Sequence, residues 1–233
     1  MNIVKSYLFI LFVAIICFAP VNAQDDPVIN YLQQAGDYAE IYNGRMEAVY
    51  NIFLYENFPY YKNSDFTEAS IIYRKNYYPN QKVRLDLYKE QLILLPPEKQ
   101  FGIIVNSQHV EKIFMYQKTF VRLNPPKESG LKQGFYIQLL EREKIQLFCK
   151  EYFYLDQKQL VYSFERKIRY YLLYNDRYFM VKNKSSFSKL FPQYKKQINI
   201  FVKDQKLNFK RNTDESLISL AVYCENLMIF DNK

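Results

Sequence analysis

The sequence predicts an α+β protein: a mainly antiparallel β-meander with a short helical segment near the N-terminus and a helical C-terminal tail packed on the sheet. The first reason is composition, because 23 Tyr and 19 Phe bring aromatic residues to 18% of the 233-residue chain, and such residues favour strands. The second is that short apolar segments separated by polar pairs recur beyond residue 46, which is typical of antiparallel pairing. The third is the helical spacing of apolar residues beyond residue 182.

Residues 1–23 have the pattern of a cleaved signal peptide. Lys5 precedes an apolar stretch at residues 7–18, and Ala23 is a small residue suited to cleavage. The stretch is shorter than the roughly 20 residues that span a bilayer, although a retained anchor is the alternative. We therefore expect an exported protein, periplasmic or associated with the outer membrane, with no transmembrane segment in the mature chain. Residues 24–233 then form a single β-rich domain.

The mature chain is expected to begin with helix and continue as strands. Pro27 suits the first turn of a helix, and one or two short helices end near Gly44. Residues 124–130 form the clearest loop and separate two halves of the sheet. The polar pairs expected at turns are Lys75-Asn76, Lys89-Glu90, the group Glu141-Arg142-Glu143, and Asn175-Asp176.

Residues 83–99, with the sequence VRLDLYKEQLILLPPEK, contain an Arg–Asp pair that marks either a site or the polar face of a hairpin. Side chains alternate along a strand, so the odd-numbered apolar residues face the core while Arg84 and Asp86 share the other face. A turn at Lys89-Glu90 and an apolar strand at residues 91–95 complete the hairpin. An exposed ion pair contributes only about 0–1 kcal/mol. The pattern therefore indicates the polar face of a hairpin in preference to a site. Arg84 and Asp86 stay candidate binding residues.

The tail, about residues 184–233, is expected to contain three helical segments. Ser185 or Ser186 can cap the first segment, and Pro192 suits the first residue of the second. Asn212 with Glu215 resembles a capping box that opens the last helix. Two apolar stripes follow from helical spacing: Tyr194, Ile198, Phe201 and Val202 in one helix, and Leu217, Leu220, Ala221, Cys224 and Leu227 in the last.

Two long segments support a resemblance. The segments RLDLYKEQLILLPPEKQFGIIVN, residues 84–106, and RYFMVKNKSSFSKLFPQYKKQINIFVKDQKLNF, residues 177–209, resemble an uncharacterised family of exported Bacteroidota envelope proteins with no established activity. The resemblance covers most of the mature chain. It implies the cell envelope as the compartment, and it transfers no catalytic residues.

The sequence offers little support for catalysis. Five Gly residues exclude glycine-rich phosphate loops, and the single histidine, His109, has no nucleophile motif or zinc-ligand spacing around it. Asp65, Glu68 and Asp86 include a potential glycosidase carboxylate pair, but their spacing does not require one. We therefore expect no metal or cofactor. Enzymatic activity stays open, with a non-enzymatic protein preferred.

The formal net charge of +8 bears on partners. In an exported protein such an excess indicates anionic lipid headgroups, acidic glycans or plain solubility, and nucleic acid is not expected. Because Lys and Arg are dispersed along the chain, solubility is the preferred interpretation.

The remaining candidates are two cysteines and two pairs of tyrosines. Cys149 and Cys224 both fall on apolar faces, so they form either a disulfide or two buried free thiols. The pairs Tyr60-Tyr61 and Tyr77-Tyr78 lie in loop-like stretches, where exposed rings suit a glycan or partner surface; the alternative is that one tyrosine of each pair belongs to the core and the other covers a sheet edge. We predict a non-catalytic envelope protein that binds a protein partner. The alternatives are a glycan-binding module and, further, a carboxylate-dependent hydrolase.

Overall fold

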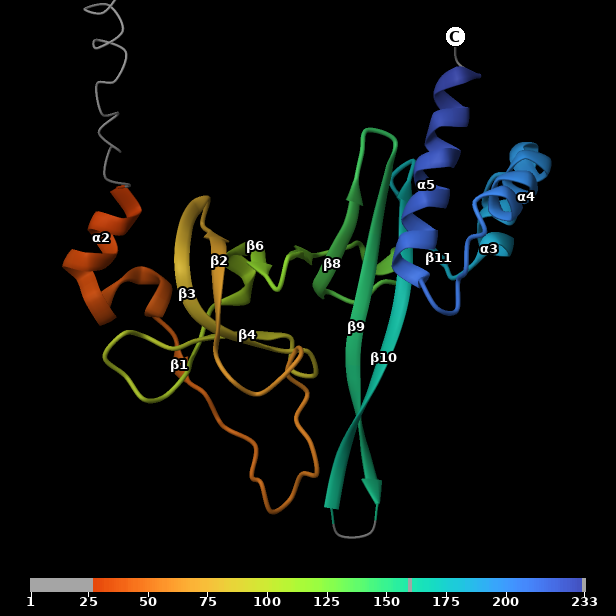
Figure 1. The fold of residues 1–233 in the computed structure, drawn as a ribbon. Coiled ribbons are helices and arrows are strands. Elements are labelled where there is room, and N and C mark those ends of the chain that lie inside the picture. Colours follow the sequence, from red (N-terminus) through yellow and green to blue (C-terminus); the bar gives the residue numbers. More distant parts are fainter. Residues whose placement is uncertain (1–26, 159–160, 232–233) are drawn as a thin grey trace, which may run out of the picture.

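The computed structural model describes residues 27–158 and 161–231, so the predicted signal peptide at residues 1–23 lies outside the described residues. The described strands form one antiparallel eleven-stranded sheet in an α+β fold, as expected (Figure 1). The strands are β1 Arg45–Met46, β2 Thr67–Tyr73, β3 Asn76–Asp86, β4 Gln91–Leu94, β5 Ile103–Ile104, β6 Val110–Met115, β7 Lys118–Leu123, β8 Gly134–Glu141, β9 Ile145–Lys158, β10 Val161–Tyr174 and β11 Arg177–Val181.

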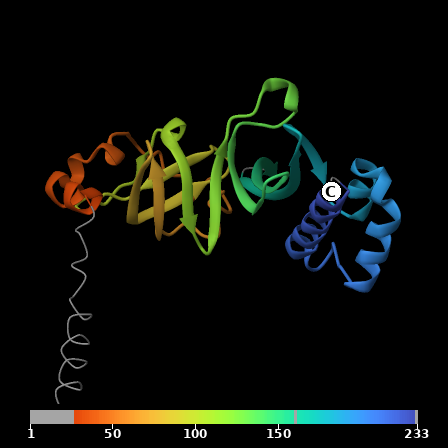
Figure 2. The same cartoon turned by 90° about the horizontal axis from the view of Figure 1, so that it is seen from above.

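The helices lie at the two ends of this sheet (Figure 2). The first helix and two short 3-10 helices stand at one end, and the tail stands at the other. The helices are α2 Pro27–Ala35, α3 Lys184–Leu190, α4 Lys195–Asp204 and α5 Thr213–Phe230, with 3-10 helices η1 Gly36–Tyr38, η2 Glu40–Tyr42, η3 Ser107–His109, η4 Lys127–Ser129 and η5 Pro192–Tyr194.

The sheet is a meander over only part of its width. From β6 to β11 each strand pairs with the next along the chain. At the other end the order is β1-β5-β4-β3-β2-β6, so the chain crosses from β5 to the far side of β2 before continuing. Three hairpins have two-residue turns with both residues left-handed, at Arg74-Lys75, Tyr116-Gln117 and Asn175-Asp176, a geometry that matches the twist of the strands.

The predicted hairpin at residues 83–99 is present. Asp86 pairs with Gln91 and Val83 with Leu94, and the leucine and isoleucine side chains of β4 are buried between β3 and β5. However, β3 already begins at Asn76. Tyr77 and Tyr78 therefore lie in a strand and not in a loop, because the turn falls at Arg74-Lys75.

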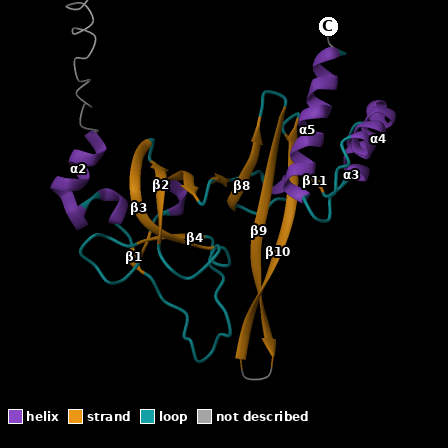
Figure 3. Cartoon of the chain, in the orientation of Figure 1, coloured by secondary structure: helices purple, strands orange, loops and turns teal. Residues whose placement is uncertain are grey.

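The largest core cluster collects side chains from β2, β3, β4 and β6 to β9, and α2 covers part of it. A second cluster lies between the tail and strands β8 to β11. Both predicted tail stripes face this second cluster, which confirms a tail packed on the sheet (Figure 3). None of the helices in the part of the chain that the structure describes combines the length and the hydropathy needed to span a bilayer.

The starts of the tail helices differ in detail from the expectation. Asn183 caps α3, because its side chain accepts a hydrogen bond from the Ser186 backbone N–H at 3.3 Å, so neither Ser185 nor Ser186 is the cap. Asn212 is the N-cap of α5, but its side chain makes no capping hydrogen bond. Pro192 does open η5, directly before α4.

One buried carboxylate fastens the tail to the sheet. Glu225 on α5 accepts hydrogen bonds from the backbone N–H groups of Lys144 at 2.8 Å and Ile145 at 3.3 Å, and it pairs with Arg142. These three partners form the turn between β8 and β9. The end of this hairpin therefore has a fixed position against α5.

Candidate functional site

The predicted binding residue Asp86 lies at the end of β3 and is buried. Its carboxylate accepts hydrogen bonds from the Tyr50 hydroxyl at 2.8 Å and from the backbone N–H groups of Tyr88 at 2.9 Å and Lys89 at 2.7 Å. Burial raises the pKa of Asp86, and these hydrogen bonds oppose that effect. The Lys89 ammonium lies 3.9 Å from the centre of the Tyr50 ring.

The other member of the predicted pair, Arg84, does not contact Asp86 as an exposed ion pair. Its guanidinium pairs with Glu47, which is buried, and lies over the rings of Tyr60 at 4.7 Å and Phe66 at 4.5 Å. The Tyr60 hydroxyl donates to the same Glu47 carboxylate at 2.8 Å. The expectation of a solvated polar face is therefore wrong, because residues 47–60 cover that face of the hairpin.

Three of the four predicted tyrosines are buried, which corrects the expectation of exposed rings. Tyr60 belongs to the Glu47–Arg84 network, Tyr61 packs edge-on against Phe120 at 4.8 Å, and Tyr78 packs near Tyr73. Tyr77 alone of the four is exposed, at 46%. The four residues do not form one coplanar platform.

The two networks fasten a loop that the sequence did not single out. Glu47 and Tyr50 hold its start against the β3–β4 hairpin, while its end is fastened to β10. Tyr162 exchanges backbone hydrogen bonds with Leu54 at 2.8 Å and Glu56 at 2.9 Å. The side-chain amide of Asn57 donates to the Phe164 carbonyl oxygen at 2.9 Å and accepts from the Phe164 backbone N–H at 2.6 Å. Figure 3 shows this segment as a loop beside the β9–β10 hairpin.

Between these attachments the loop presents apolar side chains to solvent. We call residues 46–54 the apolar loop, which begins with Met46, the last residue of β1. Its exposed apolar members are Met46, Val49, Ile52, Phe53 and Leu54, at 46–83% exposure. Its tip is ordered by a turn in which the backbone N–H groups of Leu54 and Tyr55 donate to the Asn51 carbonyl oxygen. Scattered exposed apolar residues are normal, whereas a cluster on a fixed loop indicates a contact surface. The available signal was the run Ile52-Phe53-Leu54, which is apolar without strand alternation.

The cysteines do not form the disulfide that the sequence left possible. Cys149 and Cys224 are both free and buried, Cys149 in the core of the sheet and Cys224 in the cluster beneath the tail. Burial raises the pKa of both thiols, that of Cys224 to about 12. His109 ends η3 and lies edge-on to Tyr73 at 5.9 Å.

The carboxylates considered for hydrolysis occupy different surroundings. Asp86 is buried and uses both oxygens in hydrogen bonds, whereas Asp65 and Glu68 are exposed. Among the described residues, no three His, Cys, Asp or Glu side chains gather closely enough to hold a metal ion.

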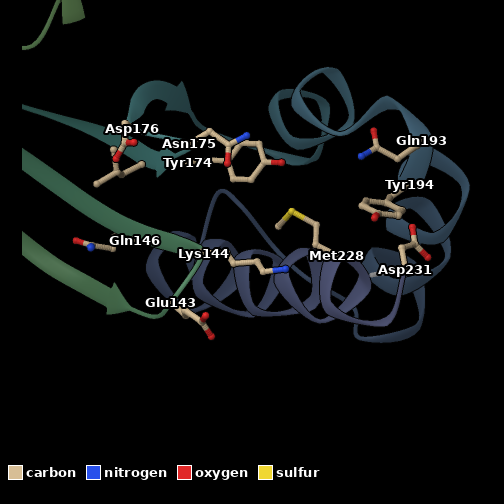
Figure 4. A pocket seen from close by; sticks show the side chains of 11 residues that line it. Glu143, Lys144, Gln146, Tyr174, Asn175, Asp176, Gln193, Tyr194, Met228 and Asp231 are labelled. Carbon is tan, nitrogen blue, oxygen red and sulfur yellow. The ribbon is translucent and has the colours of Figure 1, made fainter. Parts of the chain in front are cut away.

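A polar cavity of about 550 Å³ lies where the ends of β9 and β10 meet the tail (Figure 4). Leu173, Tyr174, Tyr194 and Met228 form its apolar lining. Carboxylates, amides and one ammonium share the rest: Glu143, Lys144, Gln146, Asn175, Asp176, Gln193 and Asp231. This mixed lining offers hydrogen bonds without selecting one sign of charge.

A scan against protein-family models gave no match, and searches among curated proteins and solved structures found no similar protein. The resemblance to exported Bacteroidota envelope proteins therefore stays a prediction.

Proposed function

We propose that the protein is exported to the cell envelope and acts, without catalysis, by binding a protein partner through the apolar loop. The observation that carries this proposal is the exposure of five apolar side chains on a loop whose two ends are hydrogen-bonded to the sheet. A fixed loop loses little conformational entropy on binding, so more of the contact energy becomes affinity.

The charges around the loop favour a protein over a lipid surface as the partner. Residues 46–61 contain two glutamates and no lysine or arginine. Segments that bind anionic membranes place several basic residues beside their apolar ones. Here the adjacent cations are few: Arg45 and Lys62 flank the segment, and the Lys89 ammonium is engaged by the Ala48 carbonyl oxygen at 3.3 Å. A protein groove with an apolar floor and polar or basic edges complements the loop better.

The edge of β10 adjacent to the loop extends the same surface. β10 pairs with β9 along its full length but with β11 only from Tyr170 onward. From Arg166 to Arg169 the described structure places no strand on that edge. An extended segment of the partner can add there as a further strand, with the apolar loop filling the adjacent groove.

The test compares affinity capture from native cells with the full chain and with an Ile52→Ser/Phe53→Ser variant. We expect one stoichiometric protein to be retained by the parent and lost with the variant, while the melting temperature changes by no more than about 2 °C, because exposed substitutions change stability by only about 0.5 kcal/mol. Tyr116→Ser, at an exposed aromatic residue of another turn, is the matched control and should retain the partner. Equal capture by the parent and the double variant would contradict the proposal.

A further inference from the structure

A second cavity, of about 260 Å³, lies between the β3–β4 turn and strands β8 to β10. It is separate from the apolar loop, and none of the residues predicted from the sequence as binding residues lines it. Its lining includes the side chains of Glu90 and Lys150, which form an ion pair at 2.6 Å. An adjacent hollow shares Glu90 and Gln133 with it and adds Arg122.

Lys150 is buried and has hydrogen-bonding capacity left over. Its ammonium donates to Glu90 at 2.6 Å and to the Phe135 carbonyl oxygen at 2.8 Å, which uses two of its three N–H groups. The other Glu90 oxygen accepts the Phe135 backbone N–H at 2.7 Å. The ammonium also lies 4.6 Å from the centre of the Tyr136 ring, so its third N–H group has no oxygen acceptor and can donate to a ligand in the cavity.

The backbone accommodates this ion pair at a conformational cost. Glu90 has a left-handed φ of 54°, which is unfavourable for a residue with a side chain. Gly134 has a φ of 152°, and a Cβ at this position would lie 2.3 Å from a Glu90 oxygen and 2.8 Å from the Lys150 nitrogen. Strain and a required glycine around a buried ion pair are features that occur at functional sites.

The charges of the cavity are predominantly positive. Lys132 and Arg169 also line it, so three cations face the single carboxylate of Glu90. In the adjacent hollow, one guanidinium nitrogen of Arg122, Nη1, is buried without a hydrogen-bond partner. Such an arrangement favours an anion, because a carboxylate can accept several charge-assisted hydrogen bonds at once.

The walls of the cavity are aromatic and carry hydroxyl groups. Tyr88, Tyr136, Tyr152 and Tyr171 line it, with Arg169 over the Tyr152 ring at 5.3 Å. Tyrosine rings offer an apolar face to the C–H surface of a sugar and a hydroxyl for its polar edge. Glu90 is an acceptor for a ligand hydroxyl and disfavours a doubly charged phosphate.

We propose that this cavity binds an acidic sugar of the uronic acid class. The sugar carboxylate pairs with Lys150, Lys132 and Arg169, its ring lies against the tyrosines, and one hydroxyl donates to Glu90. The proposal does not involve the apolar loop, because no residue of that loop lines the cavity; Arg169 alone also lies on the β10 edge where a partner strand is proposed to add.

The test is isothermal titration of the protein expressed from the full chain with sodium D-glucuronate and, as the neutral match, D-glucose. We expect saturable binding of glucuronate that is at least about tenfold tighter than that of glucose, because only the glucuronate carboxylate accepts charge-assisted hydrogen bonds from the cations of the cavity. Arg169→Gln and Lys132→Gln should each weaken glucuronate binding about tenfold. Lys195→Gln, at an exposed residue of α4, is the matched control and should bind as the parent does.

Two results would overturn the proposal. One is the absence of saturable glucuronate binding by a folded protein. The other is binding that Arg169→Gln and Lys132→Gln leave unchanged, which would place the ligand elsewhere. Both substitutions are at exposed side chains, so circular dichroism should show folded variants and keep the comparison valid. A poly-glucuronate oligomer is titrated in parallel. Tighter binding of the oligomer would show that the cavity takes a uronic acid residue within a chain, and absent binding would show that it takes the free sugar.

Discussion

Three buried carboxylates fasten two segments of the chain to the sheet: Glu47 and Asp86 hold the loop at residues 47–60 against β3, and Glu225 holds α5 at the turn between β8 and β9. Each has a cation or hydroxyl partner, and Asp86 and Glu225 also accept backbone N–H groups. Buried charges are tolerated only when they are satisfied in this way. Losing one such carboxylate leaves its donors buried and unpaired, which costs more free energy than losing an exposed ion pair.

Glu225→Ala should lower the free energy of unfolding by about 2–4 kcal/mol, because it leaves Arg142 and two backbone N–H groups without their acceptor. Urea denaturation measures this change. Asn226→Ala, at the exposed next residue of α5, is the control and should change stability by less than about 0.5 kcal/mol. Equal effects of the two substitutions would show that the tail is not fastened through Glu225.

Gly134→Ala tests the packing around the Glu90–Lys150 pair. The new Cβ would collide with both charged groups and would also be held at an unfavourable φ, so we expect a loss of about 2 kcal/mol or more. Gly130→Ala has an unfavourable φ of 70° but open space around the Cβ, and should cost only about 1 kcal/mol. The difference between the two urea midpoints measures the collision, and a smaller effect at Gly134 would contradict this geometry.

For single residues, the sequence predicted which face of a strand a side chain occupies better than it predicted which part of the chain covers that face. Alternation correctly placed the odd-numbered side chains of residues 83–87 in the core. It could not show that residues 47–60 cover the opposite face, because that contact depends on a loop whose path has no period. The same reason explains why the sequence could not decide whether Tyr60 and Tyr61 lie at the surface or in the core.

At the scale of elements, the helices of the tail and the hairpin at residues 83–99 were predictable because each has its own period and stop signals. The start of β3 and the crossing of the chain from β5 to β6 could not be predicted. Turn position depends on which two residues adopt left-handed backbone, and strand order depends on pairing between distant segments. The cavity lined by Lys150 and Glu90 depends on an ion pair between β9 and the β3–β4 turn, so no local pattern indicated it.

The cap of α3 provides a test at this scale. Asn183→Ala should lower stability by about 1 kcal/mol, because the Ser186 backbone N–H loses its acceptor at the start of the helix. Ser185→Ala, at the exposed residue that the sequence also suggested as a cap, should have little effect. Thermal denaturation of both variants decides between the two positions, and a larger loss for Ser185→Ala would contradict the assignment.

For the whole molecule, buried acidic groups predict lower stability at alkaline pH. Burial raises the pKa of Cys224, Tyr42 and Tyr61 to about 12, from 9.0 for the thiol and 10.0 for the tyrosines. Above those ordinary values the unfolded chain loses protons that the folded chain keeps, so the free energy of unfolding decreases as pH rises. Each group contributes about 1.4 kcal/mol per pH unit until its folded pKa is reached.

Urea midpoints measured from pH 7 to pH 11 test this prediction. We expect no contribution from these groups up to about pH 8 and a decline above pH 9, which becomes steeper above pH 10. Cys224→Ala should reduce the slope between pH 9 and pH 10. A midpoint that stays constant to pH 11 would show that these groups titrate as they do in water.

The molecule as a whole is an extended sheet with helices at both ends, and its apolar loop lies between the β3–β4 hairpin and β10 (Figures 1 and 2). The central claim is that a protein partner binds at this loop. The most direct measurement is photo-crosslinking in native cells, with a photoreactive phenylalanine derivative at position 53 and, separately, at position 116. The account predicts one crosslinked protein from position 53 and none from position 116. Lipid adducts only, or the same products from both positions, would contradict it.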